Sequence, residues 1–243
     1  SVTGFTKMSY RLDGEPNAYP NSSSDSHSAA RTTLRNITSS MAICSSVITL
    51  VENIVEADSD DSTFSLDHLS TLAEQASGRS IDLIIDITDE YASKHLEQIG
   101  EGTARNVYAI SHDAVLKVAK DRNSVRQNAA EAKISKNAPG APIARVMQRS
   151  RPKSVWIASQ RAAPLSGADA FEMASGQTWD SFEASIRAAV SGKKSAEPRS
   201  KLAQATWNLI YDHGLDLPDV IDLKHWGLLP DGSLVLFDYG EIE

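Results

Sequence analysis

Cysteine is almost absent from this chain: Cys44 is the only one among 243 residues. A single cysteine excludes an intramolecular disulfide and any zinc site built from several cysteines, so nothing requires an oxidising compartment. The chain also lacks an apolar run near the roughly 20 residues of a membrane helix, and its start shows no basic-then-apolar signal pattern. These absences argue against secretion and against membrane insertion.

Several common catalytic motifs are also missing. The chain contains no Gly-x-Ser-x-Gly segment, no Walker loop and no dinucleotide fingerprint. Its six histidines show no metal-ligand spacing with carboxylates or with Cys44, so we expect no metal site built from them. Serine hydrolases of that type, P-loop enzymes and histidine-based zinc enzymes are therefore not favoured.

The charge is unevenly distributed along the sequence. The net charge is -8, which argues against nucleic acid as a constant partner. Residues 98–163 nevertheless carry 12 basic and 4 acidic side chains, whereas 1–97 and 164–243 are both acidic. A segment of charge +8 between acidic flanks predicts a local site for an anion.

The first 97 residues divide into an arm and a helical extension. Residues 1–30 are rich in Ser and Asn, and predict an extended arm that buries little apolar surface. Residues 34–55 repeat apolar side chains at steps of three and four, typical of a helix with one narrow apolar seam. That seam is either an interface with another subunit or a packing surface on the chain's own domain. Further helices are expected over 65–76 and 81–96.

From residue 98 the pattern changes to short strands and then back to helices, which predicts an α+β fold. We expect a small antiparallel-sheet lobe over 98–163 and a smaller helical lobe over 164–243. The expected elements are strands at 98–101, 105–110 and 114–119, a helix at 124–136, strands at 143–149 and 154–160, helices at 168–174 and 178–190, a helix starting at Pro198, and strands at 227–229 and 234–238 joined by a turn at 229–232.

Two features of the small lobe suggest a phosphate site. Gly100 and Gly102 lie between predicted strands, where bare backbone can approach phosphates, and Val107 is placed to pack on an adenine-like ring. The alternative is ordinary hairpin turn chemistry. Lys117 lies in the middle of an apolar strand, where it needs a carboxylate or a phosphate unless it points to water from a sheet edge. Glu131, on the following helix, is a candidate partner.

The order of these features resembles the protein-kinase-like fold over residues 98–243. Residues 154–161 look like the fifth strand running into the hinge, and Asp238-Tyr-Gly240 resembles the magnesium-binding Asp-Phe-Gly of that family. The chain looks most like the short kinase-like proteins of tailed bacteriophages, in which His-Trp-Gly or Asn-Trp-Gly precedes Asp-Tyr-Gly. The resemblance implies that Gly100, Gly102, Val107, Lys117 and Glu131 bind a nucleotide, that Asp238 binds magnesium and that Asp222 is the catalytic base.

The departures from the kinase pattern are as informative as the matches. His225 stands where the family has an asparagine ligand for magnesium, and an imidazole is a poor ligand for that ion. Val220 stands at the catalytic aspartate's position, flanked by Asp219 and Asp222. Arg105 replaces the third glycine, so its side chain is expected to fill the phosphate site or to bind phosphate. Only three residues follow Gly240, which predicts a reduced large lobe, and the helical extension is expected to cover surface exposed by that reduction.

Three functions follow from this reading, and the third of them is the binding of a nucleotide without turnover. The favoured one is a degenerate, pseudokinase-like interaction or structural protein, phage-encoded and placed in the host cytoplasm or the virion. Its partner is another protein or a second copy, bound through the arm and the helix 34–55. The alternative is a phosphotransferase or nucleotidyltransferase that uses ATP and Mg²⁺. The sequence leaves open whether these cofactors are bound or none is.

Overall fold

The computed structural model describes residues 63–151, 153–192, 198 and 200–239. The chain divides into two units after Asp60, and every described residue lies in the second one. The predicted arm, and the predicted helix over 34–55 with its partner surface, lie outside the described residues. Within the described residues, no helix is both long and apolar enough to cross a membrane.

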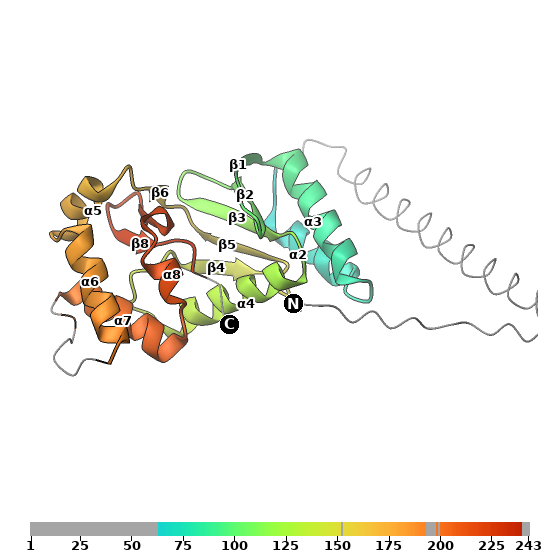
Figure 1. Cartoon of the computed structure of the whole chain (residues 1–243). Coiled ribbons are helices and arrows are strands. Elements are labelled where there is room, and N and C mark those ends of the chain that lie inside the picture. Colours follow the sequence, from blue (N-terminus) through green and yellow to red (C-terminus); the bar gives the residue numbers. More distant parts are fainter. Residues whose placement is uncertain (1–62, 152, 193–197, 199, 240–243) are drawn as a thin grey trace, which may run out of the picture. The chain divides into compact units, whose positions relative to one another are not determined.

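A five-stranded antiparallel sheet lies at the centre of this unit (Figure 1). Its spatial order is β1-β2-β3-β5-β4, so the central strand β3 has a neighbour on each side and all six of its residues are buried. The strands are β1 (Glu97–Glu101), β2 (Arg105–Ala109), β3 (Ala114–Ala119), β4 (Val146–Arg149) and β5 (Trp156–Gln160).

The two faces of this sheet carry alternate residues of each strand. Val107 of β2 is opposite Lys117 of β3, whereas the adjacent pair, Tyr108 and Leu116, points to the other face. We call the first face the pocket face and the second the back face. A one-residue shift in register would exchange their side chains completely.

Helix α3 (Ile81–His95) covers the back face, and α2 (Leu66–Gln75) packs on α3. Ser65 and Ser80 begin these helices by accepting a hydrogen bond from a backbone N–H of the first turn. Asp89 of α3 accepts hydrogen bonds from Asn106 (2.9 Å) and Tyr108 (2.7 Å) on the back face. The expectation that this extension covers surface exposed by a reduced large lobe is therefore wrong for residues 63–97, because the sheet's own back face is apolar and needs cover.

Helix α4 (Arg122–Asn137) packs against β3, β4 and β5 from the pocket face. Asp121 begins the helix, accepting from the Ser124 N–H at 2.8 Å. Ile134, near its C-terminal end, belongs to the apolar core of the remaining residues. One helix thus carries side chains to the sheet and to the second core.

That second core is built around three aromatic rings. Trp226 is fully buried and meets Phe171 and Phe182 edge to face, with ring centroids 5.8 and 5.4 Å away. The surrounding elements are α5 (Ala168–Ser175), α6 (Trp179–Val190), α7 (Lys201–His213), α8 (Leu217–Val220), the 3₁₀-helix η1 (Leu223–His225) and the three-stranded sheet of β6 (Ala163–Pro164), β7 (Trp226–Leu228) and β8 (Leu234–Leu236).

Gly227 has a specific packing role in the three-stranded sheet. A Cβ atom at this position would lie 2.5 Å from the Ala163 carbonyl oxygen, so only glycine lets β6 approach β7. The indole of Trp226 donates to the Val220 carbonyl at 2.8 Å. The Trp-Gly pair of the sequence therefore has a structural role that does not depend on any ligand.

The segment that leads into β4 pairs with the three-stranded sheet. Ile143 forms a parallel bridge with Leu236 of β8, Ala144 N–H donates to the Leu236 carbonyl (2.9 Å), and Leu236 N–H donates to that of Pro142 (2.8 Å). The Tyr239 hydroxyl donates to the Ala144 carbonyl at 2.7 Å. The chain entering β4 is thereby attached to the strand that leads to Asp238.

The fold agrees with the prediction of a mixed α+β architecture with an antiparallel sheet. The predicted strands and helices from residue 65 onward are present, with small differences at their ends. Helix α7 is an exception, because it begins at Lys201 with Ser200 as its N-cap and not at Pro198. The sequence also gave no indication of β6, α8 or η1, which are all four residues or shorter.

Candidate functional site

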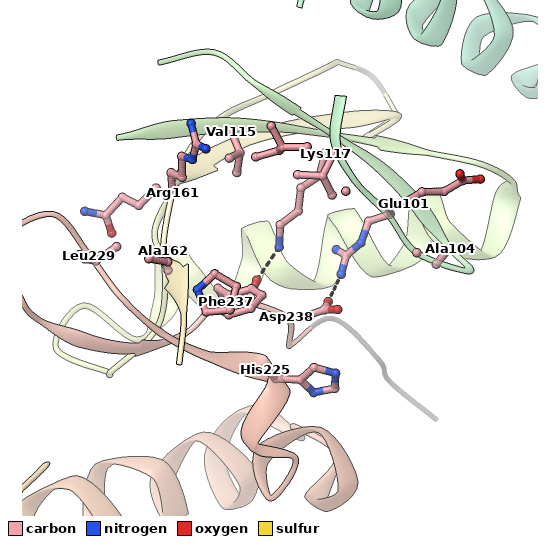
Figure 2. A pocket seen from close by; sticks show the side chains of 18 of the residues that line it. Glu101, Ala104, Val115, Lys117, Arg161, Ala162, His225, Leu229, Phe237 and Asp238 are labelled. Carbon is pink, nitrogen blue, oxygen red and sulfur yellow. Dashed lines mark hydrogen bonds and ion pairs between the residues drawn. The ribbon is translucent and has the colours of Figure 1, made fainter. Parts of the chain in front are cut away.

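A pocket of about 820 Å³ lies on the pocket face, between the five-stranded sheet and the three-stranded sheet (Figure 2). Val115, Ala162 and Leu229 lie toward one end of it, and Glu101 and Ala104 toward the other. Of the predicted site residues, the pocket is lined by Gly100, Gly102, Val107, Lys117 and Asp238.

Lys117 is buried and fully engaged. Its Nζ lies 3.0 Å from Glu131 Oε2 and 2.6 Å from the carbonyl oxygen of Phe237. The side chain of Lys117 is 7% exposed and that of Glu131 is fully buried, so each needs the other's charge. Burial lowers the pKa of the Lys117 ammonium, against the opposing attraction of Glu131. The predicted Lys117–Glu131 contact is thus present, and the edge-strand alternative is excluded.

Arg105 connects this pair to Asp238. Its guanidinium forms an ion pair with Glu131 through Nη1 and a second ion pair with Asp238 through Nη2. The Arg105 side chain is 7% exposed, because β2 directs it beneath the sheet beside Lys117. Arg105 therefore fills the space between the two carboxylates, and whether that space is a phosphate site stays a prediction.

The resulting cluster balances its own charges. Lys117 and Arg105 contribute two positive charges, and Glu131 and Asp238 contribute two negative ones. Burial opposes ionisation of Asp238, but the positive charges of Arg105 and Lys117 outweigh that effect and lower the pKa of its carboxyl. Burial also opposes the charge on Arg105, yet Glu131 and Asp238 raise the pKa of its guanidinium. Arg105 and Asp238 thus favour each other's charged forms, whereas burial lowers the pKa of Lys117.

Residues 100–102, which we call the glycine segment, line the same pocket. Gly102 N–H donates to the Arg105 carbonyl at 2.9 Å and closes the turn between β1 and β2. A Cβ at Gly100 or Gly102 would meet other atoms only at an ordinary 3.6 Å, and neither glycine has a positive φ. The backbone and its neighbours would therefore accept a small side chain at either position. Because both residues are glycines, no side chain covers the backbone at this wall of the pocket.

Asp222 does not reach the pocket lining. Its carboxylate accepts from the Lys224 backbone N–H at 3.0 Å and forms an ion pair with the Lys224 ammonium at 3.0 Å. Burial opposes its ionisation, but the hydrogen bonds from Lys224 lower the pKa of Asp222. Asp222 begins η1, and its role as catalytic base stays a prediction.

Asp219 and His225 line the pocket instead. The His225 Nδ1 lies 3.0 Å from the Asp219 backbone oxygen and 3.9 Å from its carboxylate. In the sequence Asp219 was the less favoured of the two aspartates that flank Val220. Asp219 belongs to helix α8, which brings it to the pocket. A helix of four residues is too short to show a periodic pattern of apolar residues in the sequence.

The residues near Asp238 are poorly suited to hold a metal ion. Within the described ranges, no group of three or more His, Cys, Asp and Glu side chains has the arrangement of a metal site. Mg²⁺ prefers near-octahedral oxygen ligands, whereas Asp238 is paired with a guanidinium and His225 offers nitrogen.

No protein-family model matches this chain, and comparison with curated proteins gives no match. The function of the pocket is therefore inferred from its geometry and from the chemistry of the residues that line it.

Proposed function

We propose that residues 97–239 form a degenerate kinase-like domain that binds a nucleotide and acts through binding, without transferring a phosphoryl group. The observation that carries the proposal is the convergence of Lys117, Asp238 and the glycine segment on one pocket. These groups are far apart in sequence, and the pocket places the Lys117 and Arg105 cations near the bare backbone of the two glycines.

The division of the pocket into two ends supports a nucleotide in particular. Val107 and Val115 lie on the sheet side and Leu229 on the opposite side of the pocket, so a flat apolar ring has apolar side chains to pack against. Lys117 and Arg105 lie beside the glycine segment, where a phosphate group would meet positive charge. An apolar surface with a few charged groups at one end is typical of a nucleotide site.

Binding is favoured over transfer because the catalytic groups are displaced or already engaged. Asp222 is paired with Lys224, and Arg105 pairs with one oxygen of the Asp238 carboxylate. His225 stands where a kinase has an asparagine oxygen as a magnesium ligand. Phosphoryl transfer depends on positioning and on cations that neutralise developing charge, so each of these changes reduces catalysis more than binding.

An interaction role for such a domain needs a partner. A second copy or another protein, bound through the arm and the helix over 34–55, stays a prediction from the sequence, as do the phage origin and a place in the virion or the host cytoplasm. Mass measurement of the purified full chain by light scattering tests self-assembly, and a monomer at all concentrations contradicts it.

Isothermal titration calorimetry with ATP tests the nucleotide site, in Mg²⁺ buffer and again with EDTA. We expect binding in at least one buffer, and a loss of at least about tenfold in affinity for Gly102→Asp, because the new carboxylate repels phosphates at the pocket wall. Gly140→Asp is the matched control, since that position has open space and lies outside the lining. Absence of binding at millimolar ATP in both buffers refutes the proposal.

A phosphotransferase is the second candidate, and the position of Asp219 on the pocket lining favours it. A carboxylate on the pocket lining is the kind of group that accepts the proton of an attacking hydroxyl in such enzymes. Incubation with radiolabelled ATP and Mg²⁺ separates the two functions, with Asp219→Asn and Asp238→Ala as comparisons. Phosphoryl transfer by the wild-type chain that both variants lack would replace the binding role with an enzymatic one.

A further inference from the structure

We infer that Arg105 takes the place of a divalent cation, so that the pocket binds nucleotide phosphates free of metal. This inference rests on the proposed nucleotide site and concerns the form of its ligand. Its basis is the buried guanidinium that pairs with Glu131 and Asp238 at once.

The donor set around Asp238 does not fit Mg²⁺. The carboxylate is engaged by Arg105, the neighbouring His225 presents nitrogen, and the described residues provide no cluster of three or more potential ligands. A metal ion at Asp238 would lie beside the Arg105 guanidinium, which already pairs with its Oδ1 atom and with Glu131. That arrangement places excess positive charge in a buried site.

A guanidinium is chemically suited to the role of the missing cation. It keeps its charge at all physiological pH values and has five N–H donors in a planar fork that matches carboxylates and phosphates. The ion pairs with Glu131 and Asp238 use one terminal nitrogen each. Because Arg105 also lines the pocket, it can meet a phosphate while it holds both carboxylates.

The charge balance of the cluster leads to the same expectation. Glu131 and Asp238 offset Lys117 and Arg105, so the empty cluster has no excess negative charge that a metal ion would neutralise. Lys117 donates to Glu131 and to the Phe237 carbonyl, so it is already fixed in place. Arg105 and Lys117 are therefore both held in position by protein groups, and neither requires a metal ion for its position.

The test measures ATP affinity by calorimetry for the full chain in excess EDTA and in excess Mg²⁺. For the wild type we expect affinities equal within about twofold, or tighter binding in EDTA, because the free phosphates carry more negative charge toward Arg105. For Arg105→Ala we expect binding in EDTA to weaken by at least about tenfold. Arg105→Lys retains the charge and should keep metal-independent binding at lower affinity.

Arg122→Ala is the matched control, because it removes the same charge from an exposed arginine that pairs with Asp82 outside the pocket. We expect it to bind ATP like the wild type in both buffers. The wild-type comparison decides the question even where Arg105→Ala fails to fold. Wild-type binding that requires Mg²⁺ overturns this inference and leaves the nucleotide site standing, whereas absence of binding in both buffers overturns both.

Discussion

The pocket face and the back face of the five-stranded sheet come from alternate residues of the same strands, yet they bury different chemistry. The back face presents Tyr108, Leu116 and Val118 to helix α3, and its polar contacts are hydrogen bonds to Asp89. The pocket face buries the charges of Arg105 and Lys117. Apolar burial is stabilising by itself, whereas buried charges cost desolvation energy and are stable only with their partners. The back face therefore stabilises the sheet through apolar burial, whereas the pocket face holds the charged groups that a ligand would meet.

The largest effect is expected when the charge balance of the pocket face is broken. Glu131→Ala removes a fully buried carboxylate and leaves Lys117 and Arg105 close together, so we expect the free energy of unfolding to fall by about 3–5 kcal/mol. Urea denaturation followed by circular dichroism measures the change. Glu90→Ala, which breaks an exposed pair with Lys94, is the control and should cost less than about 1 kcal/mol. Equal losses for the two variants would remove the distinction between buried and exposed pairs.

A substitution on the back face should lower stability and spare binding. Leu116→Ala leaves a cavity beneath α3, and we expect a loss of about 2–5 kcal/mol in the free energy of unfolding. At a temperature where the variant stays folded, its ATP affinity should match that of the wild type, because Leu116 points away from the pocket. A weakening comparable with that of Gly102→Asp would show that the two faces are not separable.

The smallest effect is expected from acid. Burial opposes ionisation of Asp238, but Arg105 and Lys117 together lower the pKa of its carboxyl below the unfolded value of about 3.9. A lowered pKa in the folded state contributes stability that is complete above about pH 5 and is lost as the pH falls through the folded pKa. Urea midpoints between pH 6 and pH 3 should therefore fall more for the wild type than for Asp238→Asn. Parallel curves would mean that this carboxylate adds nothing to acid sensitivity.

Much of the fold was accessible from the sequence because its signals are local. Ser65 and Ser80 begin helices at the expected positions, and the apolar run around Lys117 indicated a strand. The predicted start of α7 at Pro198 was wrong. Proline is common in a first helical turn, but the hydroxyl of Ser200 caps the helix, which begins at Lys201. The four-residue helix α8 has too few residues to produce a periodic pattern.

The candidate site was only partly accessible, because its decisive contacts are long-range. The spacing of Lys117 and Glu131 suggested their pairing, as both lie on adjacent elements. The reach of Arg105 to Asp238 spans 133 positions and depends on how the two sheets meet. The choice between Asp219 and Asp222 depended on α8 and η1, whose short turns direct one aspartate to the pocket and leave the other with Lys224.

The bridge between Ile143 and Leu236, with the Tyr239 hydroxyl on the Ala144 carbonyl, has a mechanical consequence. It attaches the segment that enters β4 to β8 of the three-stranded sheet, so backbone hydrogen bonds connect the two walls of the pocket before any ligand arrives. A ligand that fits between these walls loses its own conformational entropy on binding, but the walls do not have to become ordered. Preorganisation of this kind lowers the entropic cost of association. Rigidity of this kind selects ligands by thickness, and a flat aromatic ring is the shape that it favours.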